Sequence, residues 1–287
     1  MITSLVLTDL IQVLPLITEH HAPSDPLHLL LKKVARKEAE HVFKSSSKLR
    51  SVEFGPFGGI IFPYFEMGAV SSLNLFDLDE LIIFSFYWQN RKRYKNVADV
   101  GANIGLHSIV LSRCGFNVNS YEPDPGHYKI LKRNLALNRC AHVTGHNSAV
   151  SNEAAIKEFV KVLGNTTGSH IAGSRANLYG KLERFPVKTE PIQEIMDWAD
   201  LVKIDAEGHE KDILLATKRS DWTGTDAMVE VQSQENASAI FKHFKKLKVN
   251  LFAQKINWRK VVSEDQMPKG YKDGSLFITA GSAFIKG

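Results

Sequence analysis

The sequence contains very little cysteine. Cys114 and Cys140 are the only two cysteines among 287 residues. One pair at that separation, without a CxxC spacing, provides neither a disulfide framework nor a zinc site. This pattern excludes the small disulfide-rich classes and fits a reduced, cytoplasmic environment.

The sequence also lacks a hydrophobic run that could span a membrane. Residues 5–17 are apolar, but polar residues interrupt them and no basic leader precedes them. The run is too short for a span and has the wrong flanks for a signal peptide. We expect an amphipathic helix that packs on the body of the protein or on another subunit, which would give a homo-oligomer through this extension.

Charge of one sign is not in large excess. The formal net charge is +5, with a pI near 9.0, and basic clusters lie at residues 91–95 and 242–248. Such clusters can mark a nucleic-acid footprint, but interspersed Lys and Arg more often form a solvated face, which we favour. The net charge therefore does not identify a binding partner.

Two regions differ in pattern. Residues 1–95 predict an N-terminal extension with helices up to about residue 47, a β-hairpin at 52–64 and a helix at 77–88. Residues 96–287 alternate short apolar strands with helices, the strands being expected at 97–100, 118–122, 142–150, 201–205, 227–231, 249–254 and 276–285. This alternation predicts an α/β domain whose mostly parallel sheet has helices on both faces and binds ligands at the strands' carboxyl ends.

Residues 152–189 interrupt that alternation. We expect a strand at 156–162, followed by a Gly-rich loop at 164–173. Because a crossover helix would normally stand here, the segment forms either part of the substrate site or an ordinary surface hairpin.

The loop at residues 99–105, which reads DVGANIG, is the strongest local signal. Its glycines allow a sharp turn and close approach of a ligand, and the following helix directs its positive end at an anionic group. A dinucleotide fingerprint would require glycine where Asn103 and Leu106 stand. The spacing suits S-adenosylmethionine, whose ammonium group would have Asp99 as its counter-ion. The residues expected at the cofactor are Asp99, Gly101, Ala102, Asn103 and Gly105.

A second signal stands at the end of the next strand. Glu122 is followed by Pro123, which cannot continue a hydrogen-bonded ladder. An acidic side chain at this place accepts hydrogen bonds from a ribose diol. Asn147 and Ser148, at the end of the third strand, are expected beside the adenine ring.

A third signal, LVKIDAEGHE at residues 201–210, places acidic groups and an imidazole at the same edge. Methyl transfer to a hydroxyl requires alignment and a base, so Asp205, Glu207 and His209 are the candidate catalytic residues, and Asp205 also borders the cofactor. The cluster could instead hold a divalent cation, a role that no ligand pattern supports. We expect Glu210 to cap the following helix, and Glu230 is a weaker candidate for the site.

These segments resemble the FkbM family of S-adenosylmethionine-dependent methyltransferases. The similarity covers residues 96–232, through VADVGANIGLHS, SYEPDP and VKIDAEGHEKDILLAT followed by MVEVQ. Ala206 departs from the valine that is commoner in the family. The resemblance implies a class I Rossmann-like domain with a seven-stranded sheet, one strand antiparallel, and O-methylation of hydroxyls on natural products or sugars.

We therefore expect an S-adenosylmethionine-dependent methyltransferase that acts on a small-molecule or saccharide hydroxyl. A nucleic-acid methyltransferase is not favoured, because base-amino enzymes resemble one another in an Asn/Asp-Pro-Pro-aromatic segment where this chain has residues 205–208. Two further alternatives are a dinucleotide-dependent oxidoreductase and a non-catalytic module with a methyltransferase-like fold. The identity of the acceptor is not given by the sequence.

Overall fold

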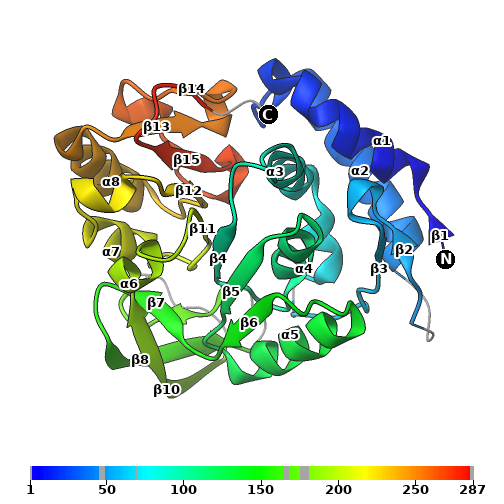
Figure 1. The fold of residues 1–287 in the computed structure, drawn as a ribbon, viewed down its shortest axis with the longest axis horizontal. Helices are drawn as coiled ribbons and strands as arrows, with labels where there is room; N and C mark the ends of the chain where they lie inside the picture. The colour runs from blue at the N-terminus through cyan, green and yellow to red at the C-terminus, as the bar shows by residue number, and fades with distance from the viewer. Residues whose placement is uncertain (1, 45–48, 69, 164–167, 175–180, 285–287) are drawn as a thin grey trace.

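A mixed β-sheet forms the centre of the protein (Figure 1). The computed structural model describes residues 2–44, 49–68, 70–163, 168–174 and 181–284. The sheet has the order β14-β13-β15-β12-β11-β4-β5-β6, and β15 runs antiparallel to both neighbours. Its strands are β4 (Asn96–Val100), β5 (Asn117–Tyr121), β6 (Val143–His146), β11 (Leu201–Ile204), β12 (Asp226–Val229), β13 (Asn250–Ala253), β14 (Arg259–Lys260) and β15 (Leu276–Thr279). The predicted α/β class is confirmed, and the two-residue β14 adds an eighth strand to the seven expected.

Helices cover both faces of this sheet. One face carries α3 (Leu78–Gln89), α4 (Leu106–Arg113) and α5 (Pro125–Leu137), and the other carries α6 (Ile192–Met196), α7 (Glu210–Leu215) and α8 (Gln234–Leu247). Alternate residues of each strand point to opposite faces, so Met228 joins the first core while Ala227 and Val229 join the second. Phe277 of β15 also joins the first core, while its neighbours Leu276 and Ile278 join the second. The continuous apolar strands in the sequence follow from burial on both faces.

The N-terminal extension packs on the first face. Besides α3, its elements are β1 (Ile2–Thr3), α1 (Leu5–Val13), α2 (Pro26–Phe43), β2 (Val52–Glu53) and β3 (Gly59–Ile60). The Ser4 hydroxyl accepts from Leu7 N at 3.1 Å and the Asp25 carboxylate from Leu27 N at 2.8 Å, which fixes where α1 and α2 begin. Both helices share a core with α3 and α4. No helix within the described ranges is long and apolar enough to cross a membrane.

Short 3-10 helices connect several of these elements. They lie at Leu14–Leu16, Thr18–His20, Gly55–Phe57, Ser72–Phe76, Arg219–Trp222, Gln254–Ile256, Glu264–Gln266 and Tyr271–Asp273.

A second, four-stranded sheet is inserted between β6 and α6. It consists of β7 (Ala149–Ser151), β8 (Ala155–Val162), β9 (His170–Ile171) and β10 (Leu182–Pro191), in the order β7-β10-β8-β9. The strand expected at 156–162 is present as β8. In Figure 1 this inserted sheet lies at the bottom, far from the N-terminal helices. Residues 164–167, in the expected Gly-rich loop, lie outside the described residues.

Two expected strands differ from the structure. The single strand predicted at 142–150 is wrong, because β6 and β7 belong to different sheets. Asn147 Nδ2 donates to the carbonyls of Glu122 and Pro123, at 2.9 and 3.1 Å, and this contact replaces ladder pairing. The strand expected at 276–285 ends at Thr279, and beyond it the Phe284 ring stacks on Trp258.

Candidate active site

The carboxyl ends of the central strands form a straight row. Val229, Ile204, Val100, Tyr121 and His146 are paired side by side across five neighbouring strands. The residues immediately after this row are Glu230, Asp205, Gly101, Glu122 and Asn147. The register therefore brings the three sequence motifs, which together span more than 100 residues of the chain, to one edge of the sheet.

A cavity of about 620 Å³, measured to its open mouth, lies at this edge. Seven of the expected site residues line it: Gly101, Asn103, Glu122, Pro123, Asp205, Glu207 and His209. Five do not: Asp99, Ala102, Gly105, Asn147 and Ser148. The cavity lies at the position that the fold predicts for a ligand.

Gly101 is required here by a close approach of the chain to itself. A Cβ atom on Gly101 would lie 1.8 Å from the carbonyl oxygen of Asp205, and its φ is +74°. At Gly105, with φ +91°, a Cβ would lie 3.2 Å from Leu131 of α5. The two glycines thus let the loop fit between β11 and α5, a packing role that the sequence pattern did not reveal.

Glu122 is held rigidly by the backbone of two loops. Its Oε2 accepts from Asn103 N at 2.8 Å and its Oε1 accepts from Asp124 N at 2.8 Å. The side chain is buried, and burial raises its pKa to about 8. Each carboxylate oxygen keeps a second lone pair, so the group can still accept hydrogen bonds from a diol.

Asp99 has a cationic partner within the protein. It is fully buried, its Oδ2 accepts from Ser108 Oγ at 2.6 Å, and its Oδ1 lies 3.5 Å from Lys203 Nζ. Lys203 also donates to Gly101 O at 3.2 Å and lies 3.8 Å from Asp205 Oδ2. Lys203 was missed by the sequence analysis, although the pairing of β11 with β4 sets it directly opposite Asp99.

Two acceptor atoms at the cavity have neither a hydrogen-bond partner nor an ion-pair partner among the described residues. They are Asn103 Oδ1 and Asp205 Oδ1, and both atoms are buried. An unpartnered buried acceptor is costly unless a ligand or water donates to it. This pair of acceptors suits an ammonium group, which is the chemistry of the amino-acid end of S-adenosylmethionine.

Negative charge accumulates around Asp205. Burial raises the pKa of Asp205, and Lys203 opposes that rise. Burial, followed by the charges of Asp205 and Glu207, raises the pKa of Glu230 far above its ordinary value. Glu80 of α3, hydrogen-bonded to His107 Nε2 at 2.8 Å, contributes to both shifts. The N-terminal extension therefore affects the electrostatics of the site, which the sequence analysis did not anticipate.

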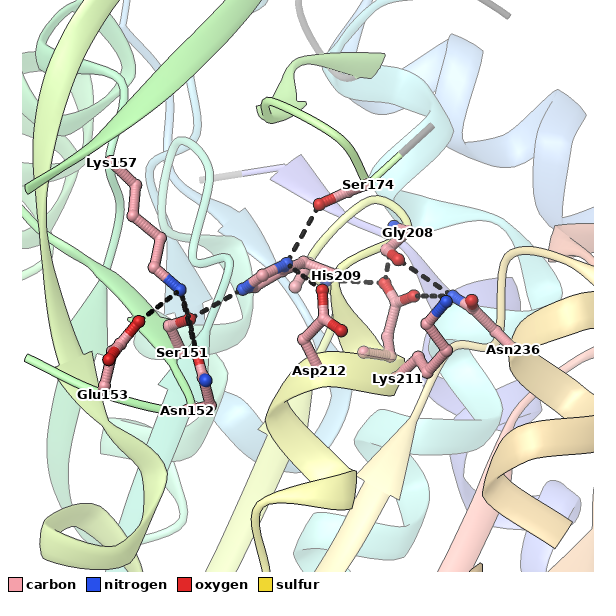
Figure 2. A network of polar contacts seen from close by, with 12 residues as sticks. Ser151, Asn152, Glu153, Lys157, Ser174, Gly208, His209, Lys211, Asp212 and Asn236 are labelled. Carbon is pink, nitrogen blue, oxygen red and sulfur yellow. Dashed lines mark hydrogen bonds and ion pairs between the residues drawn. The ribbon is translucent and has the colours of Figure 1, made fainter. Parts of the chain in front are cut away.

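His209 is the centre of a polar network (Figure 2). Its Nε2 lies 2.9 Å from Ser151 Oγ, and its Nδ1 lies 2.9 Å from Ser174 Oγ and 3.1 Å from Asp212 Oδ2. The ring is buried, and burial lowers its pKa. Both ring nitrogens are occupied by protein groups, so the imidazole is oriented rather than free.

Glu210 holds the turn that precedes α7. Its Oε1 accepts from the backbone N–H groups of Ala206 and Gly208, each at 3.0 Å, and Asn236 Nδ2 donates to Oε2 at 3.2 Å. The carboxylate thus stabilises the turn in which Glu207 takes a left-handed φ of +52°. The role is structural, but it is not the expected cap of the following helix, because the N–H groups that Glu210 binds belong to the turn before α7.

The sequence analysis missed most of the cavity's other side chains. These are Tyr121, Asp124, His127, Val150, Phe159, Ser169 and Ile171. Asp124 had a local signal, because Asp before Pro125 is a typical start of a helix. Phe159 and Ile171 had none, since only tertiary packing brings β8 and β9 over the cavity. Within the described part of the chain, no group of three or more His, Cys, Asp or Glu side chains is arranged to hold a metal ion.

The sheet order with an antiparallel β15, the glycine loop after β4 and the acidic residue after β5 define a class I S-adenosylmethionine-dependent methyltransferase. The model of the methyltransferase FkbM domain matches residues 99–255, more than half of the chain. The protein therefore belongs to the FkbM methyltransferase family.

Solved structures provide distant comparisons. The chain is similar to a precorrin-6y C5,15-methyltransferase from Geobacter metallireducens GS-15, with 12% identity over 68% of this chain and 84% of that one, at a TM-score of 0.38. An O-methyltransferase from Bacillus cereus in complex with SAH is 13% identical over 68% and 79%, at a TM-score of 0.36. At such low TM-scores these likenesses say nothing about the activity. No curated protein matches the sequence.

Proposed function

We propose that this methyltransferase transfers the methyl group of S-adenosylmethionine to a hydroxyl of a small molecule or saccharide. The observation that carries the proposal is the pair of carboxylates, Asp205 and Glu207, in the cavity that also contains Gly101 and Glu122. Transfer to a hydroxyl requires removal of its proton, and a carboxylate is a suitable base. Because burial raises the pKa of Asp205, its ionised form is a stronger base than an exposed aspartate.

We place the cofactor along the cavity in three parts. The amino-acid end lies against the loop at residues 101–103, where its ammonium group would donate hydrogen bonds to Asn103 Oδ1 and Asp205 Oδ1. The ribose lies at Glu122, and the adenine lies beyond Pro123 toward the inserted sheet. Asp99 then acts indirectly, by fixing Lys203 and the loop.

The five expected residues outside the cavity wall have supporting roles in this proposal. Ala102 and Gly105 shape the loop, as Asp99 does through Lys203. Ser148 Oγ donates to Glu190 Oε1, and Asn147 ties its own loop to the Glu122 and Pro123 carbonyls, so both hold the adenine side in place.

Among the three catalytic candidates we assign the base to Asp205, with Glu207 as the alternative. His209 is disfavoured because Ser151 and Ser174 occupy its two nitrogens. The Asp205→Asn variant keeps an amide oxygen that can accept from the cofactor's ammonium group but loses the basic carboxylate. Turnover at saturating S-adenosylmethionine should therefore fall at least about 100-fold, the usual contribution of a general base. Glu207→Gln serves as the comparison, since only the true base should abolish transfer.

The direct test is a methyl-transfer assay with labelled S-adenosylmethionine against a panel of hydroxylated small molecules and saccharides. Calorimetric titration with S-adenosylhomocysteine and NAD accompanies it. Tight NAD binding without a response to S-adenosylhomocysteine would contradict the proposal. Loss of activity in EDTA, restored by a divalent cation, would transfer the role of Asp205 from base to metal ligand.

We also propose that residues 1–95 are an extension packed on a methyltransferase domain of residues 96–287, that the protein is cytoplasmic, and that the extension supports a homo-oligomer. Support for the last point comes from Leu16, in the connection between α1 and α2, and from Leu29 and Leu30 on α2, which are 77%, 49% and 57% exposed. Light scattering should then show a dimer or larger species that Leu30→Glu dissociates.

A further inference from the structure

The inserted sheet lies over the cavity but has almost no core of its own. Phe159 of β8 and Ile171 of β9 line the cavity, and together with Ala149 and Val187 they are the only members of its buried cluster among the described residues. A unit with so few buried apolar side chains gains little stability alone. Its position over the cavity must therefore depend on contacts with the main domain.

One such contact joins β8 to the start of α5. Lys161 Nζ lies 2.8 Å from Asp124 Oδ2 and 3.1 Å from Oδ1. The Asp124 side chain is only 2% exposed, and its Oδ1 also accepts from Gly126 N at 2.7 Å to begin α5. Although burial opposes ionisation, the hydrogen bond from Lys161 brings the pKa of Asp124 below its ordinary value. The pair is therefore charged and largely shielded from water, which strengthens it.

One hydrogen bond links this ion pair to Glu122, the carboxylate expected to bind the ribose. The backbone N–H of Asp124 donates to Glu122 Oε1 at 2.8 Å. Lys161 in the inserted sheet, Asp124 and Glu122 thus form a continuous polar chain. A movement of β8 would change the position of the group expected to hold the ribose.

A second contact fixes the opposite side of the inserted sheet. His209, which precedes α7, contacts Ser151 of β7 and Ser174 after β9 (Figure 2). Lys157 Nζ of β8 reaches the same Ser151 Oγ at 2.9 Å. The sheet is therefore attached at both margins of the cavity, to α5 on one side and to α7 on the other.

We propose that the inserted sheet is the roof of the cofactor pocket, that Phe159 and Ile171 cover the adenine ring, and that Lys161 is the positioning residue that fixes this roof on Asp124. The proposal rests on the function proposed above, because it takes the cavity as the cofactor site. It explains why a methyltransferase domain has a β-sheet where a crossover helix would normally stand.

The test compares Lys161→Met with the matched control Lys188→Met, which removes an exposed lysine from β10 of the same sheet. Two probes are titrated by calorimetry: S-adenosylhomocysteine and 5′-methylthioadenosine, which lacks the amino-acid end. Because the roof covers the adenosine half, Lys161→Met should weaken both probes by a similar factor of about tenfold, within the usual range of coupling between sites. Lys188→Met should bind both probes like the wild type, and Lys161→Arg should restore binding.

Hydrogen exchange provides a second measurement that does not depend on the variant's affinity. In the wild type, S-adenosylhomocysteine should slow exchange of amides in residues 155–162, and at saturating ligand this protection should be smaller in Lys161→Met. Unchanged affinity for both probes, or loss confined to S-adenosylhomocysteine, would overturn the roof assignment. Absence of S-adenosylhomocysteine binding to the wild type would instead contradict the proposed function itself.

Discussion

Replacing Gly101 by alanine tests the physical basis of the cofactor loop. The added Cβ would stand 1.8 Å from the carbonyl oxygen of Asp205, so the loop after β4 and the end of β11 must move apart. Forcing an alanine into a left-handed conformation costs about 1–2 kcal/mol, and overpacking adds about 1–3 kcal/mol. We therefore expect Gly101→Ala to lower the free energy of unfolding by about 2–5 kcal/mol, and to weaken S-adenosylhomocysteine because Asp205 and the loop shift together.

Gly115 provides a matched control for the two contributions. Its φ is +89°, close to that of Gly101, but a Cβ there would have nothing within 4 Å. Gly115→Ala should thus lose only the conformational part, about 1–2 kcal/mol, and should bind S-adenosylhomocysteine normally. Urea unfolding measures the stability of both variants, and calorimetry measures the binding. If Gly101→Ala is as stable as Gly115→Ala, the close approach of Asp205 to the loop is refuted.

The remaining predictions concern three titratable residues, Lys203, Glu122 and His209. Lys203→Met should lower the free energy of unfolding by about 3–5 kcal/mol in urea unfolding, because Asp99 and Asp205 lose their buried cation. Adding Asp99→Asn to this variant should recover part of the lost stability. Full stability of the single variant would disprove the ion pairs. Above pH 8, where Glu122 is ionised, Glu122→Gln should weaken S-adenosylhomocysteine about tenfold in calorimetry, as expected for a lost charged hydrogen bond. Equal affinity would place the ribose elsewhere. Since burial raises the folded-state pKa of Glu122 from 4.5 to about 8, wild-type stability relative to that variant should fall as pH rises between these values. Burial lowers the pKa of His209 below 6.5, so the wild type should lose stability as the pH drops below that value. In thermal melts its melting temperature should fall more steeply with decreasing pH than that of His209→Gln. If the two melting temperatures fall in parallel, His209 is not buried as a neutral ring.

Two features of the structure could not be foreseen from the sequence, for identifiable reasons. The strand predicted at 142–150 splits at Asn147 because that side chain bonds to backbone carbonyls of a neighbouring loop, a contact that local propensity cannot anticipate. Asp99 looked like a free counter-ion, since the sequence does not show which side chain faces it. Knowing the register of β11 against β4 would have identified Lys203 at once.

The sequence by itself determined the α/β class, the approximate positions of the central strands and the three motifs at residues 99–105, 122–123 and 205–210. These depend on local information: apolar runs of strand length, glycines at turns, and acidic residues directly after strands. Tertiary structure alone decided that Lys203 neutralises Asp99, that Glu80 of the extension acts on the charges of the site, and that Phe159 and Ile171 lie over the cavity. Each of these depends on register or on packing between segments far apart in the chain, and a linear pattern does not contain that information.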